Sequence, residues 1–156
     1  MMYVLDSSSL IVCGHYFPSR FPTFWLEFNA LAQGGRIVSV REVRNELDND
    51  ATRQHLRDWI GQNKGMFPLP TPQETQFVAR IFAVRHFQQL IGAKQRLKGQ
   101  PVADPFVIAC AHVRHGCVVT EESLKPNAAR IPNVCDHFGV DCISLEELME
   151  REKWSF

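Results

Sequence analysis

The sequence lacks the features of disulfide-bonded, membrane-spanning and repetitive proteins. Its five cysteines are an odd number, and no Cys-x-x-Cys pair occurs, which argues against a disulfide framework or a redox motif. No apolar run approaches the roughly 18 residues that a membrane span requires. The chain has no internal repeat, and it starts without a charged leader or a cleavable apolar segment. We therefore expect a cytoplasmic protein with buried free thiols.

Net charge is also absent, because 17 Lys and Arg residues balance 17 Asp and Glu residues. A neutral chain does not point to nucleic-acid binding, although a local basic groove can coexist with an acidic pocket. The 156 residues, of which 45% are hydrophobic, suffice for one globular domain with a substantial core. We expect a single domain over residues 1–156 that makes no membrane contact.

Strand and helix patterns alternate along the chain. Compact apolar runs predict strands, and apolar residues spaced three or four apart predict helices. The expected strands are 2–6, 36–40, 117–120 and 140–143. The expected helices are one from near Leu10, then 22–33, 41–48, 52–63, 73–91, 104–115 and 132–138, and a last one capped by Ser144. This alternation, without hairpin signals, predicts an α/β fold: a three-layer α/β/α sandwich with a central, mostly parallel sheet.

Capping residues mark the start of two of these helices. The three serines at 7–9 offer hydroxyl caps for the first helix, so Asp6 is less needed as a cap and is favoured as a functional residue. Asp104 precedes Pro105, a pair that predicts an N-cap followed by the first turn. One carboxylate oxygen can cap a helix while the other binds a metal, so the two roles are compatible.

Acidic residues lie where the expected strands end or where neighbouring helices begin. Binding sites in open parallel sheets form at the carboxyl ends of the strands, so we expect these side chains to converge. The candidates are Asp6, Glu46, Asp104 and Glu122, with Glu121 and Glu42 as alternatives. Each acid also has a purely structural explanation, as a helix cap, a solvated helix face or a first-turn acid favoured by the helix dipole.

Converging carboxylates repel one another unless a cation lies among them. Mg²⁺ and Mn²⁺ prefer oxygen ligands, lower the pKa of a bound water and neutralise charge on a phosphate during in-line attack. We therefore predict Mg²⁺ or Mn²⁺ at these acids. Zinc is disfavoured, because the chain lacks the tight Cys or His pairs of structural zinc sites. The residues considered for zinc are Cys110, His112, His115 and Cys117, with Cys135 and His137 downstream.

Two groups of basic residues are candidates for phosphate contacts, which need only exposed positive charge near the site. The first group lies in the segment 92–101, which we expect to be an exposed loop or a frayed helix end. It comprises Lys94, Arg96 and Lys98. The second group flanks the helix of Glu46 and comprises Arg41, Arg44, Arg53 and Arg57.

Four segments together resemble the PIN domain family. They are Val4-Leu5-Asp6-Ser7-Ser8, Val43-x-x-Glu46-Leu47, Ala103-Asp104-x-x-Val107-Ile108-Ala109-x-Ala111 and Val118-Val119-Thr120-x-Glu122. Their order and spacing look like the family across nearly the whole chain. The resemblance implies a metal-dependent ribonuclease, commonly the VapC-like toxin of a toxin–antitoxin pair. It also implies that Asp6, Glu46, Asp104 and Glu122 hold the metal, supported by hydrogen bonds from Ser8 and Thr120.

The resulting hypothesis is an endoribonuclease that cuts single-stranded or looped RNA. The resemblance further implies an antitoxin partner and a possible homodimer. The alternative is a non-catalytic PIN-like module that binds RNA or protein, because Glu122 stands where the family commonly has aspartate and the chain is neutral. A phospho-acceptor signalling domain is disfavoured, since no pair of adjacent acids follows the first strand.

Overall fold

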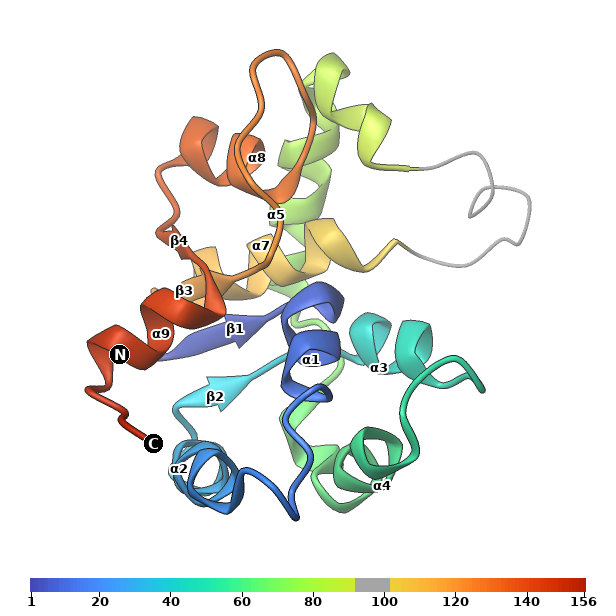
Figure 1. The fold of residues 1–156 in the computed structure, drawn as a ribbon. Coiled ribbons are helices and arrows are strands. Elements are labelled where there is room, and N and C mark those ends of the chain that lie inside the picture. The colour runs from blue at the N-terminus through green and yellow to red at the C-terminus, as the bar shows by residue number, and fades with distance from the viewer. Residues whose placement is uncertain (92–101) are drawn as a thin grey trace.

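Four short parallel strands form the sheet at the centre of the protein, as seen in a computed structural model that describes residues 1–91 and 102–156 (Figure 1). The strands are β1 (Tyr3–Leu5), β2 (Ile37–Val38), β3 (Cys117–Val119) and β4 (Cys142–Ile143). Their order in the sheet is β2-β1-β3-β4. The register places Val4 beside Val38 on one side and Val118 on the other, so β1 is an inner strand.

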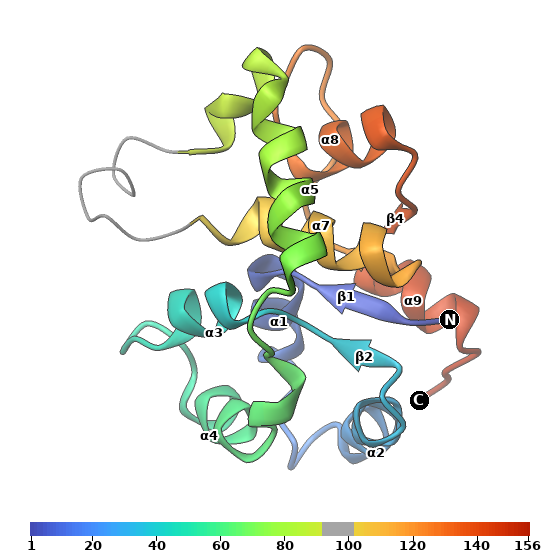
Figure 2. The same ribbon diagram turned by 180° about the vertical axis from the view of Figure 1, so that it is seen from behind.

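Helices cover both faces of this sheet. The described α-helices are α1 (Ser7–Cys13), α2 (Pro22–Gln33), α3 (Arg41–Leu47), α4 (Gln54–Gln62), α5 (Pro72–Ala83), α7 (Ala103–Arg114), α8 (Ile131–Phe138) and α9 (Leu145–Arg151). Two 3₁₀ helices, η1 (Lys64–Met66) and η2 (Arg85–Leu90), flank α5. Figure 1 presents the face with α1 and α9, and Figure 2 presents the face with α5 and α7. The predicted α/β fold with a parallel sheet between helices is confirmed.

The path of the chain explains the two helical layers. The chain moves from β1 outward to β2, and then returns past β1 to reach β3 and β4. Parallel strands are joined by right-handed crossovers, so connections that run in opposite directions along the sheet place their helices on opposite faces. The two inner strands, β1 and β3, are fully buried between these layers, and Val4, Leu5, Val118 and Val119 each have 0% exposure. Each such side chain contributes roughly 1.5–3 kcal/mol through burial.

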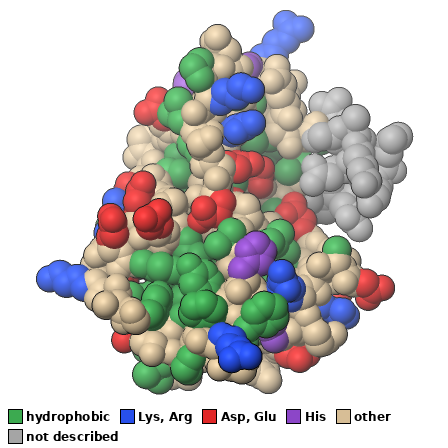
Figure 3. All heavy atoms as spheres, viewed as in Figure 1, with side chains coloured by type: hydrophobic (Ala, Val, Ile, Leu, Met, Phe, Trp, Pro, Cys, Tyr) green, Lys and Arg blue, Asp and Glu red, His purple; other side chains and the backbone are tan. Residues whose placement is uncertain are grey.

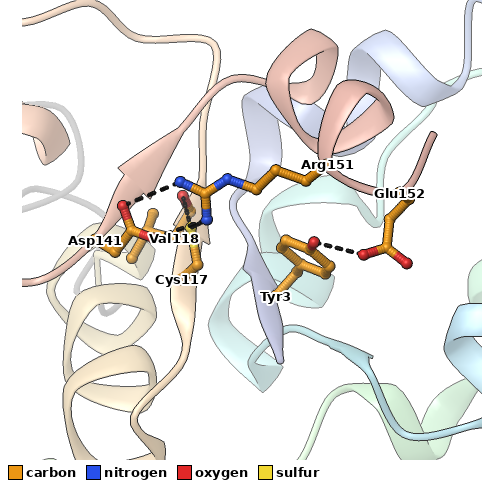
Figure 4. Close-up of polar contacts among 6 residues, drawn as sticks. All are labelled: Tyr3, Cys117, Val118, Asp141, Arg151 and Glu152. Atoms are coloured by element: carbon orange, nitrogen blue, oxygen red, sulfur yellow. Dashed lines mark hydrogen bonds and ion pairs between the residues drawn. The ribbon is translucent and has the colours of Figure 1, made fainter. Parts of the chain in front are cut away.

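Polar contacts fasten the last helix to the sheet (Figure 4). The Tyr3 hydroxyl donates to the Glu152 carboxylate at 2.7 Å, and Arg36 pairs with the same carboxylate at 2.7 Å. Arg151 pairs with Asp141 at 2.9 Å, just before β4 begins. These contacts place α9 across the first and last strands of the chain.

The predicted helix over 73–91 is wrong in its second half. α5 ends at Ala83, because Val84 adopts an extended conformation with ψ of 108°, and the chain continues as η2. Phe87 and Leu90 of η2 are still buried, so the apolar spacing persists although the α-helix does not.

The burial of the cysteines and the character of the helices test two further predictions from the sequence. The thiols of four cysteines are buried, but Cys142 is partly exposed, contrary to the prediction for all five. No described helix combines the length and the apolar character needed to cross a membrane.

Candidate functional site

Asp6 lies at the carboxyl end of β1. The chain leaves β1 toward β2 and leaves the neighbouring β3 in the opposite direction, toward β4, so the sheet has a topological switch point beside Asp6. Such switch points form the binding crevices of open α/β sheets. The Asp6 side chain is buried and accepts hydrogen bonds from three donors. The Ser9 backbone N–H lies 2.8 Å from Oδ1, the Thr120 hydroxyl 2.6 Å from Oδ2, and the Ser8 hydroxyl 2.8 and 2.9 Å from the two oxygens. These donors fix the orientation of the carboxylate.

The predicted serine cap of the first helix is wrong. α1 begins at Ser7, and the N-cap is Asp6 itself. The serine hydroxyls serve other partners, since Ser7 donates to the Glu46 carboxylate and Ser9 donates to the Val119 carbonyl at 3.0 Å. Asp6 therefore combines a capping contact with its place at the strand end, as one carboxylate can.

Glu46 connects three helices at this edge of the sheet. It belongs to α3, and one of its oxygens accepts the Ser7 hydroxyl of α1. Its other oxygen accepts the backbone N–H of Ala103, the first residue of α7, at 3.3 Å. Sequence reasoning did not identify Ser7 as a partner of Glu46, because it gave Ser7 only a role in capping the first helix.

Asp104 lies in the first turn of α7, and Val102 is the N-cap, so the prediction that Asp104 caps this helix is wrong. Burial, followed by the charges of Glu122, Glu46 and Asp6, raises the pKa of Asp104 to about 7. Asp104 is therefore poorly solvated, and the charges of the other three acids disfavour its ionised form.

The structure distinguishes Glu122 from Glu121. Glu122 accepts the Ile131 N–H at 3.0 Å, and its charge acts on Asp104. Burial raises the pKa of Glu122, and the hydrogen bond from Ile131 partly offsets that rise. Glu121 is exposed, and its carboxylate accepts the Leu145 N–H at the start of α9, also at 3.0 Å. Glu122 is therefore the one of the pair whose charge acts on Asp104.

We call Asp6, Glu46, Asp104 and Glu122 the acid cluster. The protein supplies hydrogen-bond donors to its members unevenly: three to Asp6, two to Glu46 and one to Glu122. No described residue donates a hydrogen bond to the Asp104 carboxylate by side chain or loop backbone. Asp104 is thus the member of the acid cluster whose ionised form the protein stabilises least.

The ligand atoms of the acid cluster are all oxygens, which suits Mg²⁺ or Mn²⁺. Within residues 1–91 and 102–156, no three Asp, Glu, His or Cys side chains stand close enough together to enclose a metal ion. Mg²⁺ often keeps several waters and binds through only one or two carboxylates. The acid cluster therefore fits a hydrated ion with one or two direct protein contacts, and does not fit a closed cage.

The remaining predicted site residues lie at different places. Glu42 is 1% exposed, pairs with Arg41 at 3.1 Å, and is not among the charges that act on Asp104. Arg44 lines a small hollow of about 140 Å³ together with Arg57 of α4.

The basic segment predicted to contact phosphate, with Lys94, Arg96 and Lys98, lies outside the described residues.

One of several solved structures that match the chain resembles its fold at low sequence identity. It is the crystal structure of VapBC2 from Rickettsia felis bound to a DNA fragment from their promoter. The alignment has 11% identity and a TM-score of 0.49, and it covers 92% of this chain and 98% of the other. A likeness at this level carries no conclusion about activity.

The comparisons by sequence give one family. No curated protein matches the chain. A family model described as a domain of unknown function, DUF4411, matches residues 3–156, which include all four strands and the whole acid cluster. The chain therefore belongs to the DUF4411 family.

Proposed function

We propose that the protein is a metal-dependent endoribonuclease of the PIN type. The observation that carries the proposal is that Glu46 is hydrogen-bonded to the residues next to Asp6 and next to Asp104, so that three separate segments adjoin at the carboxyl end of β1. Hydrogen bonds from Ser7 and from the Ala103 N–H to Glu46 hold these segments together. An antitoxin partner and a homodimer stay predictions of the family resemblance.

Each member of the acid cluster has a role in this proposal. Asp6 and Asp104 hold the principal metal, while Glu46 and Glu122 complete its surroundings or position the attacking water. A bound Mg²⁺ or Mn²⁺ supplies neutralising charge at the phosphate and lowers the pKa of a water. Thr120 donates to Asp6 and keeps its carboxylate oriented. Single-stranded or looped RNA is the expected substrate, because an unstacked strand can reach an acidic pocket.

Cleavage of labelled single-stranded RNA, followed on denaturing gels, tests the proposal. We expect cleavage with Mn²⁺ or Mg²⁺ and none with EDTA. Asp6→Asn should lower the rate by roughly 100-fold or more, since a metal contributes several kcal/mol to such reactions. An Asp6→Asn protein as active as the parent would refute the assignment. A parent that neither cuts RNA nor melts at a higher temperature with metal would instead support the non-catalytic alternative.

Replacing Thr120 with valine should reduce cleavage without unfolding the protein. The substitution keeps the side-chain shape but removes the hydroxyl that donates to Asp6 at 2.6 Å. Loss of such a supporting hydrogen bond typically costs roughly 10–100-fold in metal affinity or activity. The metal concentration that gives half-maximal rate should therefore rise. Thr75→Val, at an exposed position of α5, is the matched control and should leave this concentration unchanged.

A further inference from the structure

A hollow of about 430 Å³ adjoins the acid cluster at Glu46. It lies between α1, α3 and α4, and its volume falls within the roughly 300–1,000 Å³ of small-molecule sites. Leu47 and Leu56 line it with side chains that are 3% and 1% exposed, so part of its surface is firmly packed and apolar. The other lining residues are Ile11, His15, Asn49, Ala51, Thr52 and Arg53. An apolar floor with a few polar groups is typical of a ligand site.

Positive charge is available at the edge of this hollow. Arg53 is exposed, and its guanidinium lies over the Phe17 ring, 5.1 Å from the ring centroid. None of the ion pairs among the described residues involves Arg53. His15 lines the same hollow from the end of α1. Figure 3 shows histidine, basic and apolar side chains close together on the face that Figure 1 presents. An anionic group here would meet the Arg53 guanidinium, the His15 ring and apolar side chains beside the acid cluster.

The wall of the hollow is held in place by local hydrogen bonds. The Asn49 side-chain amide donates to the Glu46 carbonyl at 2.7 Å, and its oxygen accepts the Ala51 N–H at 2.9 Å. The Thr52 N–H donates to the Asn49 carbonyl at 3.2 Å. These bonds tie the turn after α3 to the residue that belongs to both the hollow and the acid cluster. The hollow is therefore preformed at a fixed position relative to Glu46.

We propose that this hollow, which we call the base hollow, binds one nucleoside of the RNA strand next to the phosphate at the acid cluster. The proposal rests on the proposed function. Single-stranded RNA is recognised by splaying out a base, packing its faces and contacting the neighbouring phosphate. Ile11, which is 46% exposed, provides apolar surface for the base above a closed floor of Leu47 and Leu56, and Arg53 provides the contact for the phosphate. The base hollow thus makes the enzyme specific for an unpaired strand.

Two substitutions at exposed positions test the base hollow. Arg53→Ala removes the phosphate contact, and Ala51→Trp fills the space with an indole. The probe is a short, fluorescent, single-stranded RNA of mixed sequence, with the dissociation constant measured by anisotropy and KM and kcat measured by cleavage. We expect each substitution to raise the dissociation constant and KM about tenfold, the usual scale for one base or phosphate contact, with kcat within about twofold of the parent. Arg85→Ala, at an exposed position of η2, is the control and should change neither constant.

The outcomes separate this inference from the proposed function. If the parent cuts RNA and both variants keep its KM and dissociation constant, the base hollow is refuted and the nuclease assignment stands. If the parent binds RNA without cutting it and both variants bind about tenfold more weakly, the base hollow is supported and the nuclease assignment fails. If the parent neither binds nor cuts the RNA with Mn²⁺ or Mg²⁺ present, both proposals fail.

Discussion

Asp104→Asn should strongly reduce RNA cleavage and, in the absence of divalent metal, stabilise the folded protein. Cleavage should fall by roughly 100-fold or more, because the amide removes one of the two proposed principal metal ligands. The stabilising effect has an electrostatic origin. Burial and the charges of Glu122, Glu46 and Asp6 raise the pKa of Asp104 to about 7, whereas an unfolded aspartate titrates near about 3.9.

The pH dependence of this effect follows from proton linkage. Between about pH 4 and pH 7 the folded state binds more protons at Asp104 than the unfolded state does, so the stability of the parent falls as pH rises. Above about pH 7 the loss is complete, and below about pH 4 it is absent. Asparagine carries no charge, so the Asp104→Asn protein lacks this dependence.

Thermal melts in EDTA at pH 5 and pH 8 measure the difference. At pH 8 the Asp104→Asn protein should melt roughly 3–8 °C above the parent, and at pH 5 the gap should be smaller. Mn²⁺ should raise the melting temperature of the parent more than that of the variant. Asp58→Asn, on an exposed position of α4, is the control and should show neither effect. A variant that melts at or below the parent at pH 8 contradicts the crowding of charge at Asp104.

Arg114→Met should produce the largest loss of stability among the substitutions considered. Arg114 pairs with Glu74 at 3.2 Å, and the Glu74 side chain is only 2% exposed. Removing the arginine leaves a carboxylate buried between α5 and α7 without its counter-charge, while methionine retains most of the aliphatic packing. We expect a loss of about 2–3 kcal/mol, because Arg114 itself is partly exposed and solvent screens the pair.

The double substitution Glu74→Gln/Arg114→Met separates charge from packing. It should recover much of the lost stability in chemical denaturation, since a neutral amide is less costly to bury than an unpaired carboxylate. Arg85→Met is the matched control at an exposed position and should change stability by less than about 0.5 kcal/mol. A single variant as stable as the parent would show that the pair contributes nothing to the α5–α7 interface.

Much of the fold was predicted from apolar runs in the sequence and from the residues at which those runs end. The run that contains Val4 and Leu5 predicts a buried strand, and the end of that run places Asp6 at the carboxyl end of the strand. The same reasoning places Thr120 and Glu122 after β3, close to Asp6. These inferences succeed because buried parallel strands are continuous apolar segments with defined ends.

Helix boundaries and hydrogen-bond partners were harder to predict. The apolar spacing of Phe87 and Leu90 continues beyond Val84, so periodicity alone does not reveal that α5 ends there. A serine after a strand can cap a helix or contact a distant side chain, and only tertiary structure decides between them. Ser7 therefore could not be paired with Glu46, 39 positions away, from the sequence.

The order of the strands in the sheet has a consequence for how the chain folds. β1 is made first during synthesis, but its inner neighbour β3 lies more than 110 residues later, as the pairing of Tyr3 with Cys117 requires. Contacts that span so much of a chain slow folding, because the closure of a long loop must precede any gain from pairing. A ribosome releasing this protein would therefore carry an apolar first strand without its inner partner until most of the chain had emerged.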